Sequence, residues 1–205
     1  MKHDYRPHLK EWRIADLRPT QVTVGFREVE RKREEWRARG HVGKSDYLGR
    51  HMLPAVIGPK AVPWIVDHHH LALALHREGA ETVLISPIAD LSDLEADEFL
   101  TFMDNRNWLH PFDAKGRRVG LDDLPKKVAD LVDDPFRSLA GSLREAGGYA
   151  KDATPYSEFL WADFLRRRIG AKALAEDAAA ALKTARELAH SEAAAHLPGW
   201  TAPQG

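Results

Sequence analysis

The stretch from Ala61 to Leu75 constrains the fold more than any other part of the chain. Residues 61–66 form a short apolar run that predicts a strand, and Leu71–Leu75 continues a helix predicted over about 68–78. Between them stand an acid and three consecutive histidines, Asp67–His70. A strand, a tight turn and a helix start expose backbone N–H groups at the positive end of the helix dipole. The pattern therefore predicts a phosphate or nucleotide site at this turn.

The rest of the N-terminal half predicts a small mixed sheet with helices. Short strands are expected over 12–17 and 81–86, and a helix is expected over 26–39. Residues 41–59 have the composition of a loop. The succession of strand, helix and strand over 61–86 predicts a right-handed βαβ unit.

The second half of the chain is predicted to be helical. Asp134-Pro135 and Thr154-Pro155 each place a capping side chain before a proline, which marks a helix start. The alanine-rich stretch 171–195 is a strong helix former and is a candidate for mediating oligomerisation. The fold class is therefore α+β, with a mixed sheet in the N-terminal half and a helical C-terminal half.

Three segments follow from this division. Residues 10–110 are expected to form the α+β core, residues 111–197 a helical extension packed on that core, and residues 198–205 a disordered tail.

Composition excludes some classes of function. The chain of 205 residues has no cysteine, which excludes disulfides and thiolate chemistry. It contains no apolar run long enough to cross a membrane and no secretory signal at its start, so we expect a cytoplasmic protein. The formal net charge of −1 does not favour nucleic acid as a partner, although local basic clusters exist.

The turn itself leaves several interpretations open. Asp67 is placed to cap the helix, which is a purely structural role. Consecutive side chains in a first helical turn fan out about 100° apart, so the three histidines cannot all face one atom. We expect two of them to face a pocket. Aspartate and histidine are also metal ligands, so a His-rich metal-binding protein is a further alternative.

Several separated blocks of the sequence resemble the ParB-like nuclease family of the ParB/sulfiredoxin superfamily. The resemblance covers about residues 14–170 and rests on the following blocks: Leu17–Gly25 with Glu28-Val29 and Lys32, Asp67–Leu71, Asp104–Arg106, His110–Asp113, Leu124-Pro125, Asp134–Ala140 and Glu158–Phe164. The resemblance implies a small ParB/sulfiredoxin-like sheet. It also implies that nucleotide phosphates bind at the turn formed by Asp67–His70. A weaker resemblance, of Val66–His69 to the Asp-His-His phosphoesterases, lacks their earlier Asp-x-Asp motif.

The superfamily includes CTP-binding DNA-segregation proteins, ATP-using sulfiredoxins and kinases of free serine. Sulfiredoxin activity needs a cysteine that this chain lacks, and the Gly-Glu-Arg-Arg block of the CTP-binding proteins is replaced by histidines. The kinases carry Asp-Gly-His-His-Arg at this turn. Asp67, His69 and His70 match that pattern, whereas His68 replaces its glycine and Leu71 its arginine. The lost arginine removes a bidentate phosphate donor.

The resemblance and the turn together imply a phosphoryl-transfer or phosphodiester enzyme, either a nuclease or a small-molecule kinase. A non-catalytic nucleotide or anion sensor is the alternative. The expected substrate is a nucleotide (ATP, ADP or CTP) or a phosphorylated small molecule, with Mg²⁺ as cofactor. The expected site residues are Glu28, Asp67 and His69 for catalysis, Gln21, Lys32, His68, His69 and His70 for phosphate binding, and Asp67 for the metal.

Overall fold

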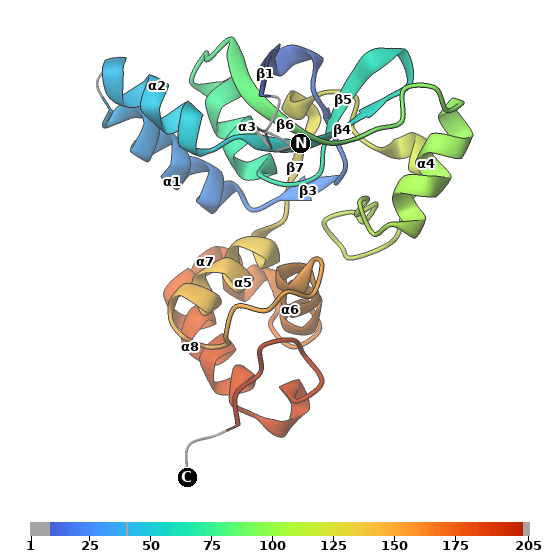
Figure 1. Ribbon diagram of the computed structural model, residues 1–205. Helices are drawn as coiled ribbons and strands as arrows, with labels where there is room; N and C mark the ends of the chain where they lie inside the picture. Colours follow the sequence, from blue (N-terminus) through green and yellow to red (C-terminus); the bar gives the residue numbers. More distant parts are fainter. Residues whose placement is uncertain (1–8, 40, 203–205) are drawn as a thin grey trace, which may run out of the picture. The chain divides into compact units, whose positions relative to one another are not determined.

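The computed structural model describes residues 9–39 and 41–202 and divides into two compact units (Figure 1). The first unit contains the chain up to Val22 together with Val29–Phe112 and Arg118–Leu131. The second contains Thr23–Glu28, Asp113–Arg117 and the chain from Val132 onward. Two short segments of the N-terminal and middle sequence therefore belong to the C-terminal unit, which is not the division at residues 110 and 111 expected from composition.

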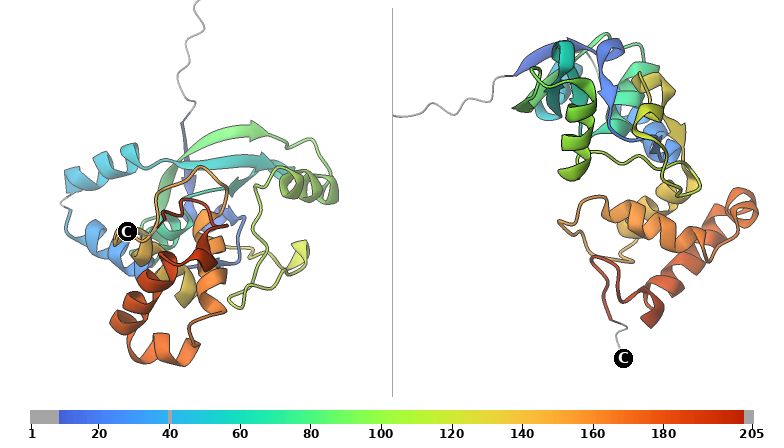
Figure 2. Two further views of the ribbon diagram at one scale, coloured as in Figure 1. Left: turned by 90° about the horizontal axis from the view of Figure 1, so that it is seen from below. Right: turned by 90° about the vertical axis from the view of Figure 1, so that its right-hand side faces the viewer.

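The first unit is built on a mixed five-stranded sheet in the order β1-β6-β4-β5-β2. The strands are β1 (Lys10–Arg13), β2 (Arg18–Pro19), β4 (Leu53–Gly58), β5 (Val62–Ile65) and β6 (Thr82–Asp90). The central strand β4 runs parallel to β6 and antiparallel to β5, and β4 and β6 lie side by side in Figure 2. The expected α+β class with a mixed sheet is confirmed.

The helices of the first unit cover this sheet. They are α1 (Phe26–Arg37, whose first turn belongs to the second unit), α2 (His41–Arg50), α3 (His69–Arg77) and α4 (Ala96–Asn105), with short 3-10 turns at Ile14–Asp16, Pro59–Ala61, Leu121–Asp123 and Val128–Asp130. Every residue of α3 from His69 to Leu75 is buried, so the helix is enclosed on all sides up to its last two residues, of which His76 is exposed. On the other face, α4 packs through Phe99 and Met103 against Val56 and Trp64.

Three expectations for the first unit were wrong in whole or in part. The strand expected over 12–17 ends at Arg13, and Ile14–Asp16 forms a 3-10 turn. Residues 41–59 are not a loop but contain α2 and the central strand β4. The segment 61–86 is not a parallel βαβ unit, because β4 lies between β5 and β6 and makes those two strands antiparallel to each other.

The second unit is a helical cluster with a two-stranded parallel sheet. Its elements are β3 (Thr23–Val24), β7 (Val132–Asp133), α5 (Pro135–Glu145), α6 (Ser157–Arg166), α7 (Ala171–Glu176), α8 (Ala178–Ala189) and a short 3-10 turn at Glu192–Ala194. Trp161, Leu143 and Leu165 are fully buried at its core. Asp134 caps α5 as expected, by accepting a hydrogen bond from the Phe136 N–H (2.9 Å).

The C-terminal residues differ from their prediction. The stretch 171–195 is two helices broken at Asp177, whose carboxylate caps α8. The start of the expected disordered tail is held in place, because the Trp161 indole donates to the Pro198 carbonyl (2.9 Å) and the Trp200 indole to the Ser191 carbonyl (3.2 Å). Residues 203–205 lie outside the described residues. Among the residues that the structure describes, no helix has the length and apolar character needed to span a bilayer.

Candidate functional site

The turn after β5 presents one acid and one histidine to solvent. Asp67 and His68 are exposed, and α3 begins at His69. His68 holds a left-handed backbone conformation (φ 63°, ψ 25°), and its N–H donates to Asp67 Oδ1 at 2.6 Å. His68, not Asp67, occupies the N-cap position, and it makes no side-chain capping bond. The structural interpretation of Asp67 as the helix cap is therefore wrong.

His69 is buried and ties two chain segments together. The Thr20 N–H donates to His69 Nε2 at 3.1 Å, and the Thr20 hydroxyl donates to the Ile65 carbonyl at 2.9 Å. Burial lowers the pKa of His69 to about 3, although Asp67 and a hydrogen bond to Ile65 oppose that shift. His69 is therefore neutral near pH 7. It holds the loop after β2 against the end of β5, a positioning role for which its charge is not needed.

The two residues that follow His69 are also buried. His70 is 7% exposed and Leu71 only 2%. The position where the serine kinases carry an arginine is thus part of the core, and an arginine there would bury a cation. Of the three histidines, the structure exposes His68 alone.

Gln21 and His110 form the neighbouring wall of this site. Gln21 is buried and pairs with His110 in an isolated parallel bridge, and the His110 N–H donates to the Thr20 carbonyl at 2.8 Å. The half-buried His110 ring packs 4.7 Å from the ring of Phe112. Thr20 thus links His110 on one side to His69 on the other. His110 was missing from the residues expected at the site, although its block was among those resembling the family.

The neighbours of Lys32 on α1 form ion pairs with the C-terminal end of α3 and not with the turn at Asp67. Arg33 pairs with Glu78 (Nε–Oε1, 2.7 Å), and Arg77 pairs with Glu30 (3.2 Å). Arg77 and Glu78 lie at the C-terminal end of α3, about 12 Å along the helix from its start. The role of Lys32 in phosphate binding stays a prediction.

Glu28 belongs to the second unit. Its carboxylate lies 3.6 Å from the guanidinium of the buried Arg137, which also approaches Glu158 at 3.9 Å. These groups form an ion-pair network within the helical unit. The role of Glu28 as a general base stays a prediction.

The side chains at the turn are too few to hold a metal ion by themselves. Within residues 9–39 and 41–202, no group of three or more histidine, aspartate and glutamate side chains is arranged to hold an ion. Mg²⁺ commonly takes only one or two protein carboxylates and completes its shell with waters and substrate phosphates. Asp67 alone is compatible with an ion of that kind.

Comparison with known proteins identifies the family. The chain resembles the crystal structure of protein Atu1540 from Agrobacterium tumefaciens, with 54% identity, a TM-score of 0.92 and coverage of 98% of this chain and 100% of that one. A search among curated proteins found no match. The model of the family described as "Putative ParB-like nuclease" matches residues 10–167. The chain therefore belongs to the ParB-like nuclease family.

Proposed function

We propose that the chain hydrolyses phosphodiester bonds in a nucleotide or polynucleotide, and that the reaction takes place at the start of α3. Membership of the family supports the class of reaction. The location is supported by the exposed pair Asp67 and His68. The next residue, His69, holds the turn in place through its buried hydrogen bond with Thr20. A carboxylate beside an imidazole at a helix start suits a site that handles phosphate and water.

Each residue of the turn has a distinct role in this proposal. The His68 imidazole and the first-turn amides of α3 bind the phosphate, and Gln21 and His110 flank it. Asp67 takes a proton from the attacking water as the new P–O bond forms and the bond to the leaving oxygen breaks. His69 and His70 support the turn from inside. Mg²⁺ arriving with the substrate would be held by Asp67 and would neutralise charge on the phosphate.

A basic surface in the second unit supports a polynucleotide as substrate. The loop Asp113–Arg117 lies against the end of α6, where a Cβ on Gly116 would come within 2.6 Å of Arg166 Nη1. The cationic residues of these two segments are Lys115, Arg117, Arg166, Arg167 and Arg168, and Asp113 is an acid of the same loop. Asp163 and Asp134 pair with some of them, but cations remain in excess. Such a surface binds phosphates in spite of a formal net charge of −1.

The test is cleavage of end-labelled single-stranded and duplex oligonucleotides with Mg²⁺. We expect Asp67→Asn to lower the rate by about 100-fold or more, because the amide accepts no proton. Asp93→Asn, a change at an exposed acid ahead of α4, serves as the matched control and should leave the rate unchanged. Equal rates for wild type and Asp67→Asn would show that the turn is not the site of hydrolysis.

A non-catalytic nucleotide or anion sensor is the second candidate. The observation that favours it is the burial of Leu71 at the position where the kinase relatives carry a phosphate-binding arginine. Phosphorus NMR of the protein with ATP, ADP or CTP and a panel of hydroxyl amino acids separates the cases. Binding without turnover of any nucleotide or oligonucleotide supports the sensor, and a new phosphomonoester on serine supports a kinase.

A further inference from the structure

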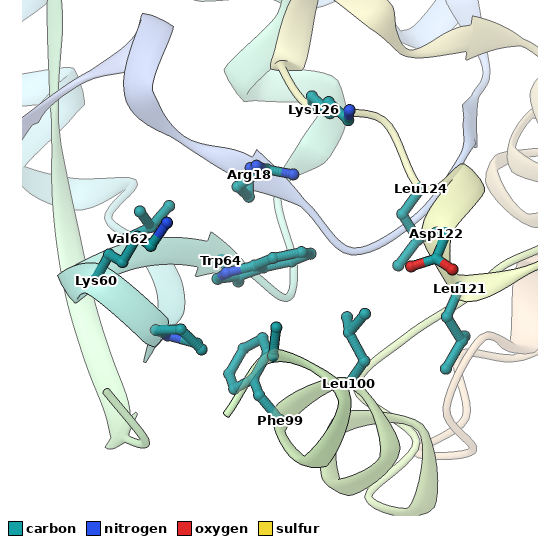
Figure 3. Close-up of a pocket in the computed structure, with 12 residues that line it drawn as sticks. Arg18, Lys60, Val62, Trp64, Phe99, Leu100, Leu121, Asp122, Leu124 and Lys126 are labelled. Carbon is teal, nitrogen blue, oxygen red and sulfur yellow. The ribbon is translucent and has the colours of Figure 1, made fainter. Parts of the chain in front are cut away.

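A pocket lies on the α4 face of the sheet, and all the residues that line it belong to the first unit. Its volume is about 360 Å³, within the range of small-molecule sites. Residues from β2, the β4–β5 turn, β5, α4 and the segment 121–126 line it, and Figure 3 shows them around Trp64.

The fold builds the floor of this pocket from two aromatic rings. Trp64 and Phe99 pack with ring centroids 5.3 Å apart and planes tilted by 53°. A Cβ at Gly58 would lie 2.8 Å from Phe99 and 2.9 Å from the Trp64 indole, so only glycine lets these rings rest on the hairpin backbone. The indole is thereby held as a fixed platform.

Cations surround the platform. The Arg18 guanidinium lies 5.3 Å from the centre of the Trp64 ring, and Lys60 and Lys126 line the same pocket with a single carboxylate, Asp122. In Figure 3, Arg18 and Lys126 lie on one side of the indole and Phe99 on the other. Lys60 and the residue after it both have positive φ angles (60° and 56°) at the hairpin tip, a strained backbone of the kind found at functional sites.

This combination selects a ligand with an aromatic ring and an attached anion. An aromatic and guanidinium surface stacks against a nucleobase of any sequence, and the lysines at the rim suit its phosphate. A purely apolar ligand would gain nothing from three cations.

The pocket is lined in part by residues that lie close along the chain to the turn at Asp67. Trp64 precedes Asp67 by three residues, which span at most about 10 Å of extended chain. Arg18 pairs in register with Trp64, and two residues later Thr20 holds His69. We propose that this pocket binds the base of the nucleotide whose phosphate is handled at the turn. This inference rests on the proposed function and names the base-binding subsite of the same site.

Calorimetric titration of the full chain tests the proposal with four ligands: inorganic phosphate, a nucleoside, a nucleoside monophosphate and a short single-stranded oligonucleotide. Trp64→Ala should weaken binding of the monophosphate roughly tenfold or more while leaving inorganic phosphate unchanged. Leu121→Trp fills the pocket without altering the platform and should have the same effect, which separates lost binding from misfolding. Trp64→Phe should restore much of the affinity.

The control is Trp200→Ala. Trp200 belongs to the second unit, where its indole donates to the Ser191 carbonyl, and it does not line the pocket. Its loss should leave every affinity unchanged. Monophosphate binding that survives both Trp64→Ala and Leu121→Trp would overturn the pocket proposal even if cleavage at Asp67 were confirmed. Nucleoside binding that is lost in these variants, in a protein with no phosphate binding at the turn, would support the pocket and contradict the proposed function.

The oligonucleotide separates the two sources of the base. Tighter binding of the oligonucleotide than of the monophosphate, with both weakened by Trp64→Ala, indicates the end of a nucleic-acid strand. Equal affinities indicate a free nucleotide.

Discussion

At the scale of single residues, two neighbouring histidines differ in exposure and in role. His68 is exposed in a left-handed conformation, whereas His69 is buried, neutral and hydrogen-bonded to Thr20. The sequence predicted a polar site at Asp67–His70, but it could not distinguish these roles. The direction of each side chain depends on the left-handed turn at His68, and although histidine is enriched in that conformation, a positive φ stays uncommon for any one non-glycine residue. His110 escaped prediction because only the fold brings it beside Thr20.

The buried state of His69 predicts a specific dependence of stability on pH. The unfolded chain protonates this ring below about pH 6.5, whereas the folded protein resists protonation until about pH 3. The stabilisation is therefore complete above pH 6.5 and declines as the pH falls toward 3, by about 1 kcal/mol per pH unit. In urea unfolding between pH 7 and pH 4, His69→Gln should show a shallower decline than wild type. Parallel curves for the two proteins would contradict the buried neutral ring.

The left-handed conformation of His68 predicts a contrast between two substitutions. His68→Gly relieves the backbone strain, whereas His68→Ala retains the Cβ and the strain. The glycine variant should therefore be the more stable of the two, by up to about 1 kcal/mol. Both variants lack the imidazole and should lose phosphate affinity to the same extent. Thermal unfolding and phosphate titration measure the two effects, and an alanine variant at least as stable as the glycine variant argues against the strained turn.

At the scale of elements, patterns predicted the segments that obey local rules. The strand at β5 and the helices α1 and α3 lie within a few residues of their predicted bounds. The strand β4 was missed because its apolar run contains Pro54 and lies within a segment of loop-like composition, whereas β5, which contains Pro63, is followed directly by a helical pattern. The helix α2 contains two glycines, and it is supported by Tyr47, which packs its ring 6.0 Å from that of Trp36. Such tertiary support has no signature in local propensity.

The caps of α5 and α8 allow a comparison of how much stability a buried and an exposed capping aspartate contribute. Asp134 is 1% exposed and also pairs with Arg166 at 2.6 Å. Asp134→Ala therefore removes the cap and one of the two carboxylates beside Arg166, which keeps Asp163 at 3.0 Å, and should cost about 3 kcal/mol. The exposed Asp177 caps α8 through backbone N–H groups only, and Asp177→Ala should cost about 1 kcal/mol. Chemical denaturation measures both changes. Similar losses for the two variants would contradict the buried ion pair.

At the scale of the whole molecule, the chain crosses between its units more often than a linear division predicts. Residues 23–28 pair with the C-terminal unit through β3 and β7, and residues 113–117 lie against α6. The sequence predicted the fold class and the separation of sheet from helices. It could not predict these crossings, because the two segments, of six and five residues, are too short to carry a compositional signal of their own.

The basic surface of the second unit predicts a moderate salt dependence of nucleic-acid binding. Contact with about three phosphates would give a slope of about −2 in a plot of log affinity against log salt for a single strand. The double variant Arg117→Glu/Arg167→Glu should weaken oligonucleotide binding at low salt and flatten this slope, while a dinucleotide is bound as before. Fluorescence anisotropy across a salt series measures both, and a slope near zero for wild type would contradict a polynucleotide substrate.

The central claim is that substrate phosphate binds at the start of α3. The most direct measurement is a titration of ¹⁵N-labelled protein with a nucleoside monophosphate, followed through backbone amide shifts. The account predicts that the largest saturable shifts fall on His68, His69 and Leu71, and that Asp93 does not move. Saturable binding with unmoved amides at the start of α3, and shifts confined to another part of the chain, would contradict it.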